Sequence, residues 1–270
     1  MATTKTLFLE LFQPFAQYRN PFTFYYAQTF PLPPKSTIIG MLQNAVGEWY
    51  NEKYWDLKVS IHGGFESVFW NYQQFIKGDI KFQKVNNQLV SVNQERSLYG
   101  QGLKSQRSPL SQQELFNGHL WIFLRGEADM IDKIKNALEK PKKVLYLGRS
   151  EDIIFIKKLK VCEVDQITTS IAKKNIWLFE KPMYIKKEQF PIKNNKYPVY
   201  SISTNVFFKN NNRTISSKAE LNKDTIREPK FETVIYTGTD YIIHLSNEIE
   251  IEDIILGELR FRIPTEYGWL

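Results

Sequence analysis

The chain contains few of the residues that build disulfides or metal centres. Cys162 is its only cysteine, which excludes an intramolecular disulfide and a zinc site built from several cysteines. The three histidines, His62, His119 and His244, lie far apart in the sequence, and none has metal-ligand spacing to another histidine or to the cysteine. We therefore expect no metal and no cofactor, and we interpret each histidine as structural.

Long hydrophobic runs are also missing. The first residues, MATTKTLFLELF, contain a short apolar run interrupted by Glu10 and do not continue into a secretory segment. No run approaches the roughly 20 apolar residues that a membrane-spanning helix needs. We expect a cytoplasmic protein in a reducing environment, with no membrane partner.

Several motifs of nucleotide and hydrolase chemistry are absent. Lys35-Ser36-Thr37 resembles the end of a P-loop, but the glycine-rich cradle of that motif is replaced by Phe30-Pro31-Leu32-Pro33-Pro34. No G-x-S-x-G or C-x-x-C pattern occurs, which argues against a serine hydrolase or a thioredoxin-like centre. The ribonucleoprotein signature of ordinary RNA-recognition sheets is absent too, so we do not expect RNA on the sheet face.

What the chain does contain is apolar surface, aromatic rings and positive charge. The apolar fraction of its 270 residues is 42%, which is enough for a real core, and aromatic residues make up 14%. The formal net charge is +7 and the sequence pI is about 9.2. This balance suits a polyanionic partner such as nucleic acid.

The first 160 residues show an alternation of strand and helix patterns. Residues 7–12 alternate as a strand, 38–49 have one apolar helical face, and 59–75 look like a second strand with a bulge or bend at Gly63-Gly64. A continuously apolar strand at 120–124, a helix at 130–138 and a last strand at 144–147 follow. The order β-α-β-β-α-β predicts an α+β, ferredoxin-like (RRM-like) domain over residues 1–160.

A polar insertion at about 78–114 interrupts this pattern. Between residues 80 and 112 it has few large apolar residues and five basic residues against Glu95 alone. Asn86-Asn87, between two apolar stretches, predicts a hairpin turn. Because such a segment cannot bury itself, we expect a protruding β-hairpin.

Residues 161–270 show no helical pattern, and their sequence predicts short strands separated by polar turns. We expect a smaller, β-rich second domain there. Eleven basic residues face four acidic ones between 181 and 230, whereas the segment 248–258 is acidic. The positive charge is therefore expected to form a face.

Residues 13–47 are the candidate binding segment. A long aromatic loop ends at Pro33-Pro34, and Ser36 is a good N-cap for the following helix. The start of a helix offers unpaired N–H groups and partial positive charge to an anion. The candidate binding residues are Tyr18, as a base-stacking ring, with Arg19, Asn20, Lys35, Ser36 and Thr37 around it.

Two stretches resemble one known family. Phe15-Ala16-Gln17-Tyr18-Arg19, followed by FPLPPKSTIIGML over residues 30–42, resembles the amino-terminal signature of the CRISPR-associated Cas five family, and YLGRSED over residues 146–152 resembles a later motif of that family. The resemblance covers roughly residues 6–156. It implies a RAMP protein with a ferredoxin-like domain and a β-hairpin thumb, which caps the 5′ handle of CRISPR RNA in a Cascade-type complex.

The resemblance also implies roles for particular residues and partners. Arg19 and Lys35-Ser36 would lie on handle phosphates, with Arg149 and Ser150 in a turn facing the handle. Arg96, Lys104 and Arg107 of the thumb would reach RNA and the neighbouring backbone subunit. The large subunit is another implied partner, and a contact with target DNA near the PAM stays open.

Three functions compete at this stage. The first is a non-catalytic RNA-binding subunit. The second is a metal-independent endoribonuclease that processes precursor CRISPR RNA, with His119, Tyr18 and Lys35 as candidate groups. Some family members cut RNA with a Tyr, Lys and His set, but no matching adjacent Lys-His pair is found here. The third is a scaffold that binds mainly protein.

Overall fold

The fold is described from a computed structural model of the chain. The structure describes residues 3–23, 26–77, 81–85, 88–92, 106–172, 175–194, 196–210, 213–215, 217–238 and 240–270. Of these, residues 74–77, 81–85, 88–92 and 106–108 are described by their backbone only. Arg96 and Lys104 of the expected thumb lie outside the described residues.

A five-stranded sheet with two helices forms the first part of the chain. The order of its main elements, β1-α1-β3-β6-α2-β7, is the β-α-β-β-α-β order that the sequence predicts. Strand β6 lies between β3 and β1, β7 flanks β1, and the short β2 pairs in parallel with β6. The bounds are β1 Thr4–Ala16, β2 Tyr26–Ala27, α1 Lys35–Val46, β3 Lys58–Lys77, β6 Gln106–Glu127, α2 Ala128–Glu139 and β7 Phe155–Cys162.

Alternation along β1 divides the core of this sheet between its two faces. Leu9 and Leu11 belong to the hydrophobic cluster that contains Ile38 of α1 and Ile134 of α2. Phe8 points the other way and joins a second cluster with residues of the carboxyl-terminal half. Because successive residues of a strand point to opposite faces, β1 contributes to a buried cluster on each side of the sheet.

The last strand of this order differs from the prediction. Residues 144–147 were expected to form it, but Tyr146 makes only an isolated bridge with Ile153, and the strand is β7 at Phe155–Cys162. Its lysines weakened the apolar pattern in the sequence. Gly63 was expected at a bulge or bend, yet the pairing of β3 with β6 shows no register shift there. Its φ is 123°, and a Cβ would lie 2.1 Å from the carbonyl oxygen of His119, so the glycine permits a close backbone approach.

The start of α1 also differs from the prediction. Pro34 occupies the N-cap position and makes no side-chain capping bond, so Ser36 lies inside the first turn and is not the cap. Proline fits this position because helix starts do not use every backbone donor. Gly47 ends the helix with a φ of 87°, in the left-handed region that favours glycine.

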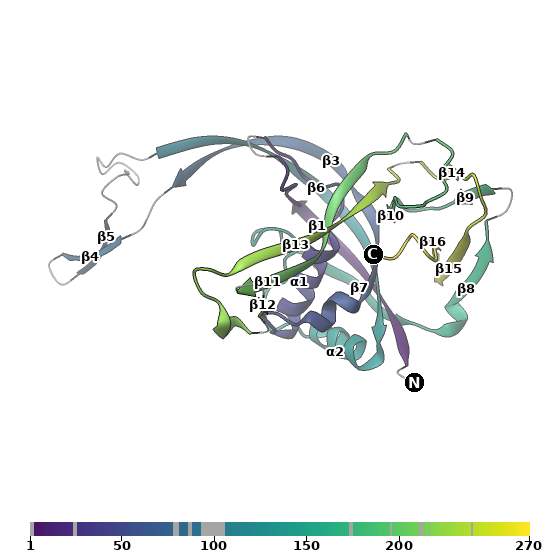
Figure 1. Ribbon diagram of the computed structural model, residues 1–270, viewed down its shortest axis with the longest axis horizontal. Coiled ribbons are helices and arrows are strands. Elements are labelled where there is room, and N and C mark those ends of the chain that lie inside the picture. Colours follow the sequence, from purple (N-terminus) through teal and green to yellow (C-terminus); the bar gives the residue numbers. More distant parts are fainter. Residues whose placement is uncertain are drawn as a thin grey trace.

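Strands β3 and β6 continue far beyond the sheet as a two-stranded arm. Their pairing runs unbroken to Lys77 and Gln106, and Figure 1 shows these ends extending away from the rest of the molecule. Strands β4 (Lys81–Val85) and β5 (Gln88–Val92) pair with each other, as the predicted hairpin requires. The turn residues 86–87 themselves lie outside the described residues.

The carboxyl-terminal half is built of strands, as predicted. One four-stranded sheet has the order β10-β13-β11-β12, and β14-β9 and β16-β15-β8 form two smaller sheets. The sequence did not predict β8, β10, β12 and β15. The bounds are β8 Ile167–Ile171, β9 Ile176–Leu178, β10 Tyr184–Lys186, β11 Val199–Asn210, β12 Arg213–Thr214, β13 Ile226–Tyr236, β14 Ile242–His244, β15 Glu250–Leu256 and β16 Leu259–Pro264.

The acidic segment 248–258 contains β15, and two of its carboxylates, Glu252 and Asp253, are buried. Glu252 accepts two hydrogen bonds of 2.8 Å from Arg125 of β6, and the Arg125 guanidinium lies 4.0 Å from the ring centroid of Trp269. Asp253 pairs with Arg260 and Arg262. Each buried carboxylate therefore has a cationic partner, as burial of a charge requires. The contacts of Arg125 join the two halves of the chain.

Candidate nucleic-acid interface

A cavity of about 270 Å³ lies at the amino-terminal end of α1. It brings together the loop after β1, the first turn of α1, the turn at 148–149, and strands β11 and β13. The lining residues used below are Tyr18, Arg19, Ser36, Thr37, Arg149, Ser203, Arg227 and Phe231. Five of these eight, Tyr18, Arg19, Ser36, Thr37 and Arg149, were candidates from the sequence.

The cavity is positively charged. Arg19 and Arg227 are exposed, and within the described part of the chain neither forms an ion pair with a carboxylate. No aspartate or glutamate is among the lining residues that the structure describes. Two unpaired guanidinium groups in a concave, acid-free wall suit the oxygens of a phosphate.

The start of α1 adds to this charge. Pro34, Ser36 and Thr37 line the cavity, and the Pro34 carbonyl already accepts from Thr37 and Ile38. The first N–H groups of a helix have no acceptor within it and carry partial positive charge. An anion in the cavity would therefore meet both arginines and the helix terminus.

Two contacts fix the two halves of the cavity wall against each other. The hydroxyl oxygens of Ser36 and Ser203 lie 2.6 Å apart, which ties α1 to β11. The rings of Phe22 and Phe231 lie 5.1 Å apart, which ties the loop after β1 to β13. Asn20 accepts a hydrogen bond from the Phe22 amide and shapes this loop locally. Preorganised walls reduce the ordering that a ligand would otherwise impose.

Arg149 is held by carboxylates, in contrast to its expected place on RNA. Its guanidinium lies 2.8 Å from Asp152 Oδ1, 2.9 Å from Glu114 Oε1 and 3.4 Å from Glu151 Oε1. Burial lowers the pKa of Arg149, but the hydrogen bonds to Asp152 and Glu114 together raise it above its usual value. Because Asp152 is fully buried, this arginine compensates protein charge before it meets any phosphate.

Tyr18 is buried and is not the base-stacking ring that we expected. Only 2% of the residue is exposed, its hydroxyl donates to Gln13 Oε1, and its ring meets Phe65 edge-on at 6.0 Å. Burial, with a smaller effect of Asp152, raises the pKa of Tyr18 well above its ordinary value. The ring packs against apolar neighbours because exposing it to water would be unfavourable.

Lys35 is also buried, contrary to its expected place on a phosphate. It is 6% exposed, and its Nζ donates a 3.0 Å hydrogen bond to the Trp55 carbonyl. Burial lowers the pKa of Lys35 to about 8. The long side chain turns inward beneath the helix, so its ammonium group does not line the cavity.

The other candidates lie elsewhere. Ser150 is exposed and donates to Glu151. The backbone of Arg107 pairs with Ile76 in the β3–β6 arm, but its side chain, like Arg96 and Lys104, lies outside what the structure describes. These expectations remain predictions.

The groups of the nuclease hypothesis do not converge. Tyr18 and Lys35 are buried in separate surroundings, while His119 is exposed on β6 with its ring 5.3 Å from that of Phe12. Within the described ranges, no cluster of three or more histidine, cysteine or acidic side chains could hold a metal ion.

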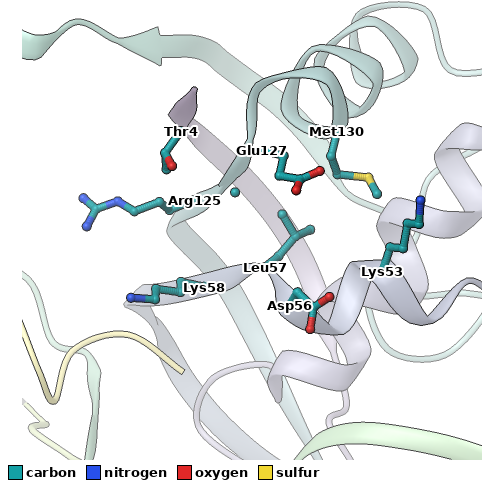
Figure 2. A pocket seen from close by; sticks show the side chains of 9 residues that line it. Thr4, Lys53, Asp56, Leu57, Lys58, Arg125, Glu127 and Met130 are labelled. Carbon is teal, nitrogen blue, oxygen red and sulfur yellow. The ribbon is translucent and has the colours of Figure 1, made fainter. Parts of the chain in front are cut away.

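A second cavity is lined by charges of both signs and is less suited to a polyanion. It has a volume of about 430 Å³ and lies between β3, β6 and the start of α2. Figure 2 shows Lys58 and Arg125 on one side of it and Lys53 on the other, with Asp56 and Glu127 between them. Cations and carboxylates alternate here, so this cavity does not offer a polyanion the uniform charge of the first one.

The model of a family described as CRISPR-associated protein (Cas_Cas5) matches residues 6–206. The chain belongs to this Cas5 family. No curated protein matches the sequence.

The fold of this Cas5 chain is similar to that of a chain in a solved "CRISPR RNA-guided surveillance complex". The identity is 13% and the TM-score 0.50, over 96% of this chain and 91% of that one. A CRISPR protein from Archaeoglobus fulgidus matches with 9% identity and a TM-score of 0.43, over 97% and 100%. In the part of the Cas5 chain that is described, no helix has the length and apolar character to cross a membrane.

Sequence reasoning missed the part of the site that comes from the carboxyl-terminal half. Arg227, Ser203 and Phe231 lie about 200 residues after Arg19, and no local pattern links them. The basic surplus between 181 and 230 was the available signal, and Arg227 belongs to it. Only the packing of β11 and β13 beside α1 decides which basic residue of that stretch faces the cavity.

Proposed function

We propose that this Cas5 chain is a non-catalytic CRISPR RNA-binding subunit of a type I Cascade interference complex and caps the 5′ handle of the guide RNA. Family membership supports the biological setting. The observation that carries the proposal is the cavity at the start of α1, which no described aspartate or glutamate lines and where Arg19 and Arg227 have no carboxylate partner in the described part of the chain. Unpaired RNA threaded there would present phosphates to these groups.

The proposal includes the architecture and the partners. Residues 1–160 would form a ferredoxin-like RAMP domain, with the β3–β6 arm and β4–β5 as its thumb, and residues 161–270 the smaller β-rich domain. The order of strands β7-β1-β6-β3, with both helices on one face, supports this reading. The backbone and large subunits are the proposed protein partners, and target DNA near the PAM is a further one.

The binding test replaces Arg19 and Arg227 by alanine and measures handle-RNA affinity against salt concentration. Each lost phosphate contact lowers the slope of log K against log salt by about 0.7 for single strands, so the double variant should lose about 1.4. Arg213→Ala with Lys223→Ala removes two exposed basic residues outside the cavity lining and is the matched control. Wild-type affinity and slope in the Arg19, Arg227 variant would refute the assignment.

The non-catalytic part of the proposal has its own test. Labelled repeat RNA incubated with the purified chain in EDTA should stay intact. The separate burial of Tyr18 and Lys35 supports this expectation. A discrete product that disappears in His119→Ala would instead establish the metal-independent endoribonuclease.

A further inference from the structure

The face of the sheet opposite the helices is only partly covered. Phe261 of β16 packs on Phe8 and Phe123, with ring centroids 5.7 and 4.9 Å apart, and Trp121 borders this contact at 6.2 Å. Two residues further along β6, His119 is exposed. The cover therefore ends at Trp121, and the remaining part of the face is open.

Three rings lie side by side on this open part. In the strand pairing Phe12 of β1 is the partner of both His119 of β6 and Phe155 of β7. The ring centroids of Phe12 and His119 are 5.3 Å apart, and those of Phe12 and Phe155 are 6.2 Å apart. Cross-strand partners share one face of a sheet, so these rings form a continuous surface, which we call the ring platform. Phe155 is 52% exposed, an unfavourable position for a ring without a ligand.

Two lysines lie near this surface, one over its middle ring and one over the neighbouring Trp121. Lys157 Nζ lies 5.5 Å from the Phe12 ring centroid, and Lys181 Nζ lies 4.7 Å from that of Trp121. Glu10 lies in the row between them and has Lys158 as its strand partner, so that row adds no net charge. Rings flanked by cations suit a strand of nucleic acid, whose bases stack while its phosphates pair. A purely protein-binding apolar patch would not need the cations.

We infer that the ring platform of Phe12, His119 and Phe155 is a second nucleic-acid site, which stacks unpaired bases of a single strand. Phe12 and His119 lie on the two central strands of the sheet, the positions from which four-stranded sheets of this topology stack two or three bases. The site shares no residue with the cavity at α1. It differs from the expectation, drawn from a missing signature, that RNA does not bind the sheet face. Stacking on this platform tolerates any base, since every base has a π-face.

The binding experiment uses the full chain with fluorescein-labelled eight-nucleotide probes, oligo-U and oligo-dT, followed by anisotropy at low salt. Phe155→Ala combined with His119→Ala should weaken binding about tenfold or more, because each substitution removes a ring on which a base stacks. Phe155→Tyr, which keeps a ring, should retain affinity. Tyr241→Ala removes a ring that is 59% exposed elsewhere and should change nothing. Comparison of the two probes shows whether RNA or DNA is preferred.

Crosslinking of the unaltered protein provides the second measurement, which needs no folded variant. Oligo-U with 4-thiouracil should give adducts in the peptides that contain Phe12, His119 or Phe155. Adducts only elsewhere, or wild-type affinity in the double variant, overturn the inference. So does a variant that keeps oligonucleotide affinity but no longer assembles with its partner proteins, since the platform then docks protein. Arg19→Ala with Arg227→Ala should leave the platform adducts in place, so this inference and the handle proposal fail separately.

Discussion

Arg149 offers the sharpest test of the reasoning, because the family resemblance and the structure assign it different roles. The resemblance implies that its turn faces the RNA handle. In the structure its guanidinium bonds to Asp152 and Glu114, whose side chains are 0% and 10% exposed. The perturbation is Arg149→Met, which keeps an unbranched apolar side chain and removes the charge.

The expected loss of stability follows from the two carboxylates left behind. Breaking a buried ion pair by removing one partner costs about 3–5 kcal/mol. Asp152 still accepts from the Gln17 and Arg149 amides, and Glu114 still accepts from Gln112, so we expect the lower end, about 3 kcal/mol. With a urea m-value of about 3 kcal/mol/M, the unfolding midpoint should fall by about 1 M.

Urea titration followed by circular dichroism measures the midpoint, and handle-RNA binding is measured below it, where the variant is folded. Lys135→Ala is the control, because it removes one partner of an exposed pair with Glu139 and should change the free energy of unfolding by less than about 0.5 kcal/mol. A midpoint within 0.2 M of wild type, together with a salt slope reduced by about 0.7, would refute the structural role and place Arg149 on a phosphate.

Two further predictions concern buried titratable groups. Lys35→Met should raise the free energy of unfolding at pH 7 by about 2 kcal/mol. Burial lowers the pKa of Lys35 to about 8, so the ammonium group costs the folded state about 3 kcal/mol relative to the unfolded chain. Loss of the hydrogen bond to Trp55 offsets about 1 kcal/mol of the gain. Unfolding measured from pH 7 to 11 should show this gain shrinking above pH 8, and a gain that does not depend on pH would contradict the explanation. Burial also lowers the pKa of His62 to about 3; because only the unfolded chain then binds a proton below pH 6.5, wild type should lose about 2 kcal/mol relative to His62→Gln between pH 7 and pH 5. The exposed His244→Gln is the control, and equal losses in wild type and His62→Gln would contradict this prediction.

Local patterns succeeded where neighbours in sequence decide the structure. Both helices, strands β1 and β3 and the pairing of β4 with β5 follow from periodicity and turn residues that any short segment displays. Strand β15 was missed because its three acidic residues resemble a solvated surface segment. Arginines from β6 and β16 pair with its buried carboxylates, and this pairing allows the strand to lie inside the fold.

The candidate site was predicted in place but not in detail. Arg19, Ser36 and Thr37 do meet at one cavity. Tyr18 and Lys35, next to them in sequence, turn inward, because a motif of residue types does not specify which side of a loop or helix faces the core. The direction of a side chain depends on neighbours that pack against it from distant segments.

The sequence by itself determined the family, the positive charge, the β-α-β-β-α-β order of the first part of the chain and the start of the first helix near Lys35. The tertiary structure decided which charges are free: it placed Arg149 among carboxylates, left Arg19 and Arg227 without a carboxylate partner among the described residues, and brought the rings of Phe12, His119 and Phe155 together on the uncovered part of the sheet. The physical reason is that composition fixes how much charge and apolar surface a chain has, whereas long-range packing fixes how much of each remains in contact with water.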